Sequence, residues 1–130
     1  MRLSLLIFVL CAAAILGFLA WAGAIHFLYT RFFWFDIMMH ALGGFVVGLA
    51  YLWWVRYEPP RGIPLRLFSI PALFVAVLLV GIAWEAYELL IRVDAQYTVL
   101  VWLFDTAQDI VMDMAGGAGA FMFFKRFAHE

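Results

Sequence analysis

The chain has 130 residues, of which 68% are hydrophobic and only 13% are charged, and its formal net charge is −1. A soluble globular domain has about 25% charged residues and roughly half apolar ones, so this composition excludes that class. A net charge so close to zero also argues against nucleic acid as a partner, because binding to phosphates depends on basic residues. We therefore expect an all-α polytopic membrane protein, in contact with membrane lipids and built as one domain over residues 1–130.

The apolar segments predict about four transmembrane helices. A bilayer core about 30 Å thick requires about 20 apolar helical residues. Residues 3–25 meet this length without a charge, and residues 37–55 form a second span that is interrupted only by His40. The prolines and the glycine of residues 56–64 break helices and predict a loop. The third predicted span covers residues 67–84 and continues as a helix beyond them.

The fourth predicted span differs from the other three because its uncharged part is too short. Residues 114–124 lack charge, but they cover only about 16 Å at 1.5 Å of rise per residue. To cross a bilayer, this helix must extend back through Asp113 and Asp109 toward Asp105, which carries carboxylates below the membrane surface. Residues 95–104 are uncharged and also too short to span, so we expect them to form a short interfacial or re-entrant segment.

The distribution of basic residues predicts the orientation of the chain. In a four-span arrangement most of them fall on the side of both termini, and cytoplasmic segments of membrane proteins are enriched in Lys and Arg. We therefore expect both termini in the cytoplasm. The basic residues on that side are Arg2, Arg56, Arg61, Arg66, Lys125 and Arg126, and those on the opposite side are Arg31 and Arg92.

Three of the predicted helices carry ionisable residues spaced three or four positions apart, which places each set on one helical face. All three sets lie toward the non-cytoplasmic side of the predicted topology. An Asp near the centre of a membrane helix costs roughly 2.5–3.5 kcal/mol, so such groups persist where they pair, are protonated or share a cation. The sets are Asp36 and His40 on the second helix, Glu85 and Glu88 on the third, and Asp105, Asp109 and Asp113 on the fourth.

This composition of ligands favours a bound divalent metal. Arg31 and Arg92 are the only nearby fixed positive charges in the predicted topology, and two arginines cannot neutralise so many carboxylates. Carboxylate and imidazole groups on facing helices suit Zn, Mn or Fe. Two alternatives remain, namely a protonated, hydrogen-bonded network that only packs the helices, and a proton or ion pathway. The candidate metal ligands are Asp36, His40, Glu85, Glu88, Asp109 and Asp113.

Three sequence segments resemble small bacterial membrane families, the VanZ-like proteins and the YjdF-type inner-membrane proteins. Residues 35–44 resemble their Asp-x-x-x-His element before a glycine-containing helix, residues 84–88 are similar to the aromatic Glu-x-x-Glu element, and residues 109–117 to the closing Asp-x-x-x-Asp-Met element. The match is nearer the YjdF type, because VanZ-like sequences usually have Asn at the position of Asp113. The spacing of Asp105 differs from the YjdF pattern.

The resemblance implies a location in the bacterial cytoplasmic (inner) membrane but no defined reaction. VanZ-like members are associated with glycopeptide resistance, and YjdF-type proteins have no established reaction. The residues support metal-dependent chemistry on the head group of a lipid or cell-wall precursor. One alternative is a non-catalytic accessory subunit of a larger membrane complex, or a homo-oligomer, and another is ion or proton handling. Close helix packing is the expected role of the two glycine groups, which are Gly43, Gly44 and Gly48, and Gly116, Gly117 and Gly119.

Overall fold

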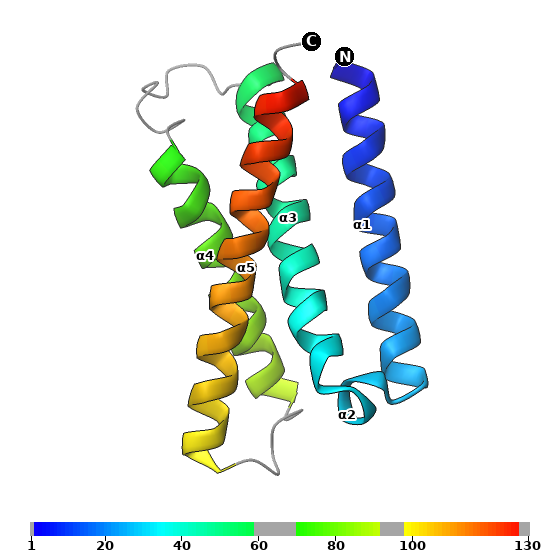
Figure 1. Ribbon diagram of the computed structural model, residues 1–130, viewed down its shortest axis with the longest axis vertical. Helices are drawn as coiled ribbons and strands as arrows, with labels where there is room; N and C mark the ends of the chain where they lie inside the picture. The colour runs from blue at the N-terminus through cyan, green and yellow to red at the C-terminus, as the bar shows by residue number, and fades with distance from the viewer. Residues whose placement is uncertain (1, 59–69, 92–97, 128–130) are drawn as a thin grey trace.

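A computed structural model describes residues 2–58, 70–91 and 98–127, and every regular element in these ranges is a helix (Figure 1). Four helices are long and one is a single turn. The start of α1, the end of α3 and the end of α5 lie at one end of the molecule, and α2 lies at the other (Figure 1). The helices are α1 (Arg2–Ile25), α2 (Leu28–Arg31), α3 (Phe33–Tyr57), α4 (Ile70–Ile91) and α5 (Val99–Phe127).

The long helices have the properties of membrane-spanning segments. Within the described ranges, α1, α3 and α4 are long and apolar enough to cross a membrane. Large apolar side chains lie on the outside of the protein, as with Leu90 at 80% exposed and Val99 at 74%. Such extensive apolar exposure is typical of a surface that faces lipid, since soluble monomers rarely have large apolar patches. The prediction of an all-α polytopic membrane protein is therefore confirmed.

The region before the last helix differs from the prediction. Residues 95–104 are predicted to form a short interfacial or re-entrant segment before the last helix, but Val99 to Phe104 are the first turns of α5. The remainder of that segment up to Tyr97 lies outside the described residues, as does most of the predicted loop at 56–64. The physical reason for the difference is continuity of backbone hydrogen bonding. The N–H of Trp102 bonds to the carbonyl of Thr98, so the helix already begins ahead of the acidic positions.

A short helix that the sequence pattern does not predict connects α1 to α3. Phe27 adopts a left-handed backbone conformation with φ 55°, which turns the chain sharply after α1. The hydroxyl of Thr30 donates a hydrogen bond to the Phe27 carbonyl at 3.0 Å, and α2 ends at Arg31. Tyr29 then packs edge-on against Phe35 with ring centroids 4.9 Å apart. This turn positions Tyr29 next to the first residues of α3.

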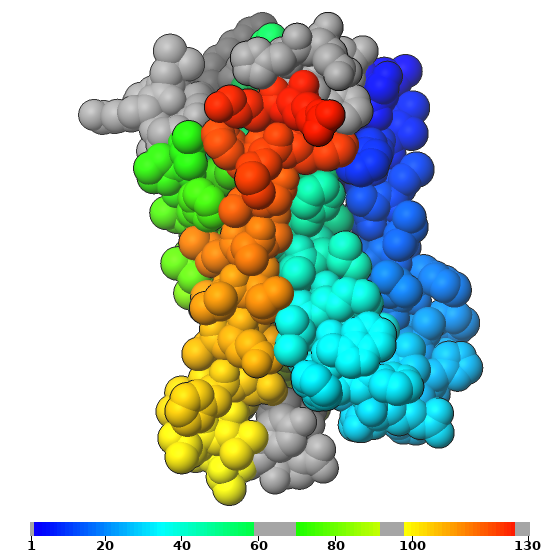
Figure 2. Space-filling model, in the orientation of Figure 1, coloured from blue at the N-terminus to red at the C-terminus, as the bar shows by residue number. Residues whose placement is uncertain are grey.

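Helices α3 and α5 make the closest helix pair, and glycine permits their approach. A Cβ atom on Gly44 would overlap the backbone carbonyl of Asp113, and one on Gly116 would overlap the carbonyl of Ala41. Backbone atoms cannot move aside as a flexible side chain can, so the two helices could not lie this close with larger residues. In Figure 2, α5 in orange and red lies directly beside α3 in cyan on the viewed face. The expected packing role of these glycines agrees with this geometry.

The interior of the bundle has an apolar half and a polar half. Toward the start of α1, the core contains Val9, Leu49 and Ala120, all buried. At the same end, Arg2 forms an ion pair with Glu58 and thereby joins the start of α1 to the residue after α3. Toward the opposite end, buried ionisable side chains lie beside the buried apolar Phe35 and Met39, and they are His40, Glu85, Asp109 and Asp113.

Candidate metal centre

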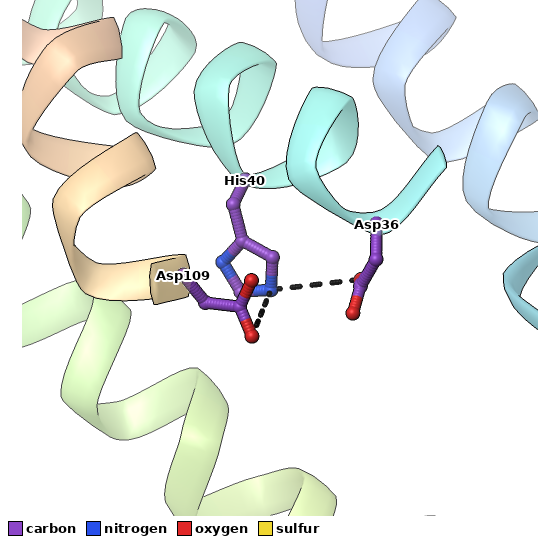
Figure 3. A group of neighbouring side chains, drawn as sticks. All are labelled: Asp36, His40 and Asp109. Carbon is purple, nitrogen blue, oxygen red and sulfur yellow. Dashed lines mark ion pairs between the residues drawn. The ribbon is translucent and has the colours of Figure 1, made fainter. Parts of the chain in front are cut away.

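His40 lies at the centre of the polar half, on the second turn of α3. Its side chain is 5% exposed, and carboxylates from three helices surround the imidazole. The spacing of Asp36 and His40 along α3 places both on the same helical face. Figure 3 shows the ring directed away from its own helix, with Asp109 of α5 and Asp36 of α3 beside the same ring nitrogen.

Three carboxylate oxygens lie at nearly equal distances from the Nε2 atom of His40. Asp36 Oδ1 is at 3.7 Å, Glu85 Oε1 at 3.8 Å and Asp109 Oδ2 at 3.8 Å. Two ligand atoms about 2.1 Å from a tetrahedral metal ion lie about 3.4 Å apart. The observed separations exceed this value by only a few tenths of an ångström. These separations fit a small divalent cation between Nε2 and the carboxylates of Asp36 and Asp109, whose ligand atoms all lie within 4.8 Å of one another.

The other ring nitrogen of His40 faces Asp113. Its Nδ1 atom lies 3.4 Å from Asp113 Oδ2. A histidine that binds metal through one nitrogen commonly donates the N–H of the other to a carboxylate, which fixes the tautomer and the orientation of the ring. The absence of a side chain at Gly81 allows α4 to approach this carboxylate, because a Cβ there would overlap Asp113 Oδ2. Asp113 is thus placed to orient His40 rather than to share an ion with Nε2.

Asp109 is the most deeply buried of the carboxylates. The residue is only 2% exposed, and its Oδ1 atom has no hydrogen-bond partner among the described residues. Leaving a buried polar atom unsatisfied costs about 1–3 kcal/mol, and more for a charged group. A cation at the cluster would compensate the negative charge of this carboxylate.

A second group of possible ligands shares His40 and lies on α4. Ligand atoms of His40, Glu85 and Glu88 lie within 4.8 Å of one another, as do those of His40, Asp36 and Asp109. Trp84 donates its indole N–H to Glu88 Oε1 at 2.8 Å. From α5, Thr106 donates a hydrogen bond from its hydroxyl to Glu85 Oε2 at 2.7 Å. Both glutamates are thereby held in place by neutral donors.

A cavity of about 310 Å³ adjoins the cluster between α1, α3 and α4. Of the ionisable cluster, Asp36, His40, Glu88 and Asp113 line it. Tyr29 also lines the cavity, and burial, followed by the negative charges of Asp36 and Glu88, raises the pKa of its hydroxyl to about 12. This phenol therefore stays protonated and can donate a hydrogen bond at neutral pH.

The structure brings together the six side chains that the sequence pattern singles out. The carboxylates differ in which nitrogen of His40 they face, because Asp113 faces Nδ1 while three other carboxylates face Nε2. Asp105, the seventh residue of the acidic pattern, belongs to neither of the two ligand groups. His26 is exposed beyond the end of α1, and Arg92 lies outside the described residues.

Sequence reasoning missed Thr106 and Tyr29. Thr106 precedes Asp109 by three positions, so helical periodicity placed it near the same face and was a usable signal. Tyr29 had no such signal, since it depends on the left-handed turn at Phe27. It also depends on Gly23, where a Cβ would lie 2.6 Å from Phe35 and 2.7 Å from Tyr29 ring atoms.

Comparison with known proteins places the whole chain in one family. The model of a family described as predicted membrane protein (DUF2238) matches residues 1–130. No curated protein and no solved structure matches the chain significantly.

Proposed function

Since the chain belongs to the DUF2238 family of predicted membrane proteins, we propose that it is a metal-dependent membrane protein that acts on the head group of a lipid or cell-wall precursor. The observation that carries this proposal is the environment of His40 Nε2, which has three carboxylate oxygens from three helices within 3.8 Å. Zinc, manganese and iron all accept imidazole and carboxylate ligands. The proposed site residues are Asp36, His40, Glu85, Glu88, Asp109 and Asp113.

The residues divide into those that hold the ion and those that face the cavity. In the proposed site, His40, Asp109 and the cavity-lining Asp36 form one ligand group, Glu85 belongs to the second group that shares His40, and Asp113 orients the imidazole. A divalent cation there supplies Lewis-acid and water-activating chemistry. Glu88 lines the cavity and is only partly buried, so we assign to it the transfer of a proton to or from the reacting head group.

Two other functions use the same residues without metal chemistry. In an accessory subunit, His40 as an imidazolium would pair with the surrounding carboxylates and the cluster would only hold α3, α4 and α5 together. In ion or proton handling, the cluster would be one step of a pathway. The burial of Asp109 with an unsatisfied Oδ1 favours the metal, because a purely structural network is expected to satisfy its buried oxygens.

We further propose that the protein is nearer the YjdF type than the VanZ-like proteins. This proposal rests on the Asp at position 113, where VanZ-like sequences usually have Asn, and on Glu88 at the end of the Glu-x-x-Glu element, where they often have Gln. The family match supports membership of a membrane-protein family and does not name either type. The glycopeptide-resistance association is therefore not carried over.

The proposed location is the bacterial inner membrane, with α5 as a fourth span, both termini in the cytoplasm and the cluster toward the outer side. To test this, Cys11 is replaced by Ala, and a single cysteine is introduced by Lys125→Cys or Phe33→Cys. Both positions are exposed, and they lie at opposite ends of the bundle. An impermeant thiol reagent added to intact cells is expected to modify the Phe33→Cys variant and to spare the Lys125→Cys variant. The reverse pattern would place the cluster on the cytoplasmic side.

The purified protein is expected to bind a divalent metal in stoichiometric amounts. Asp113→Asn is expected to weaken that binding by roughly 10–100-fold, because loss of a carboxylate that orients a ligand commonly has an effect of this size. The variant keeps the shape of the side chain and removes its charge. Metal content is measured by elemental mass spectrometry, and affinity by titration with Zn, Mn and Fe salts. Far-UV circular dichroism confirms that the variant folds.

The metal-free functions give a different result for the same variant. A protonated aspartic acid and an asparagine are both neutral and can both hydrogen-bond, so Asp113→Asn would be almost silent in a structural network. Absence of metal from both proteins after titration would reject the metal-dependent function and favour the accessory subunit, whereas equal affinity in the two would reject the orienting role of Asp113.

A further inference from the structure

We propose that the cavity between α1, α3 and α4 holds the hydrocarbon chain of a membrane lipid whose head group lies at the His40 cluster. This inference rests on the proposed function, because it names the substrate class of the same site as a lipid bound through its chain as well as its head group. Three observations carry it, namely the lining of the cavity, its direction and its width.

The inner part of the cavity is lined by apolar and small side chains. On α1 the lining residues include Ala13 and Gly17, and on α3 and α4 they include Val47 and Val77. A Cβ atom added to Gly17 would meet nothing within 4 Å, so α1 leaves open space on this side. Apolar cavities of this kind stay dry and bind apolar groups. Both α1 and α4 are candidate membrane spans, so the medium available to fill the space is hydrocarbon.

The cavity runs along the helices from this apolar region to the ionisable cluster. Its lining on α4 includes Val77 and Glu88, which lie about 16 Å apart along a helix with 1.5 Å of rise per residue. His40 and Asp36 line the same cavity at the polar end. A lipid lies along the bilayer normal with its head group at one end, so both the direction and the polarity of the cavity match such a molecule.

The width of the cavity excludes a helix as its occupant. A volume of about 310 Å³ spread over a length of about 16 Å makes a long and narrow space. A helix with side chains is about 10–12 Å across, so its cross-section is about 80 Å² or more. A helix of a second copy or of another membrane protein is therefore too wide to enter, whereas a single hydrocarbon chain is narrow enough.

The test uses a matched pair of variants on α1. Ala13 lines the cavity and its neighbour Ala14 does not, and both are exposed. The wild type, Ala13→Phe and Ala14→Phe are placed in nanodiscs of phosphatidylglycerol that carries a photoactivatable diazirine in its acyl chain. Peptide mass spectrometry then locates the adducts after illumination. Adducts at Val47, on the α3 side of the cavity, report a chain inside it.

Adducts at Val47 are expected in the wild type. Their yield should fall about tenfold or more in Ala13→Phe, because the ring fills the cavity, and should stay within about twofold of the wild type in Ala14→Phe. Equal adduct yields in the two variants, or no adduct at Val47 in the wild type, would overturn the inference. A change of oligomer mass in Ala13→Phe but not in Ala14→Phe would overturn it too, because a second copy of the chain would then be the occupant of the cavity. The metal content of the same samples is measured separately. If the expected adducts form but no metal is bound, the lipid-chain inference stands and the metal-dependent function is rejected. If metal is bound but no adducts form at Val47, the metal-dependent function stands and the lipid-chain inference is rejected.

Discussion

Gly44→Ala is expected to destabilise the protein by an amount at or above the upper end of the roughly 1–3 kcal/mol range that overpacking typically costs. The added methyl group would overlap the backbone carbonyl of Asp113 on α5. Because that atom belongs to the backbone, α3 and α5 must separate to accommodate the methyl. Separation would also move Asp113 away from His40, so metal affinity should fall together with stability.

The adjacent glycine provides the control. A Cβ atom on Gly43 would lie 3.8 Å from Asp113 Oδ1, which is an ordinary contact distance. Alanine is favoured over glycine in a helix by about 0.5–1 kcal/mol, so Gly43→Ala should be neutral or slightly stabilising. Thermal unfolding in detergent, followed by far-UV circular dichroism, compares the two variants with the wild type. Equal unfolding temperatures for the two alanine variants would contradict the close packing of α3 against α5.

The helices were predictable from sequence because the membrane imposes one simple requirement. Every span must be long, apolar and helical, so uncharged stretches of sufficient length identify α1, α3 and α4. The start of α5 was not predictable in the same way. Charge counting separated the uncharged residues before Asp105 from the acidic part of the helix, whereas backbone hydrogen bonding joins them. A charge pattern describes the surroundings of a helix and does not define where its hydrogen bonds begin.

The composition of the cluster was predictable, but its internal arrangement was not. A spacing of four positions places Asp36 with His40, and Asp109 with Asp113, on common helical faces. Periodicity does not reveal which nitrogen of His40 each carboxylate faces, because that depends on the rotation and separation of α3 and α5. The glycines at positions 44 and 116 set this separation. The sequence thus predicts a set of equivalent ligands, whereas the structure distinguishes Asp109 beside Nε2 from Asp113 beside Nδ1.

Asp109→Asn is expected to reduce metal affinity by more than the roughly 10–100-fold expected when a carboxylate that only orients a ligand is lost. Asp109 Oδ2 lies 3.8 Å from His40 Nε2, and the residue is 2% exposed, so water cannot easily replace the missing carboxylate oxygen. Asparagine has nearly the same shape and carries no charge. The metal-free variant should therefore fold, and its stability should equal or exceed that of the metal-free wild type, since a buried charge has been removed.

Asp105→Asn is the matched control, because the same substitution is made one helical turn away on α5, at a residue that belongs to neither ligand group. It should leave metal affinity within about twofold of the wild-type value, a change of well under 1.4 kcal/mol.

Thermal unfolding with and without added Zn gives an independent measurement, since a ligand at 100 times its Kd stabilises the folded state by about 2.7 kcal/mol. Zn should raise the unfolding temperature of the wild type and of Asp105→Asn, and should leave Asp109→Asn almost unchanged. If Zn stabilised the two variants equally, Asp109 would not be a ligand. If it stabilised none of the three proteins, the carboxylates around His40 would instead act as a structural network, whose buried charge Asp109→Asn would relieve.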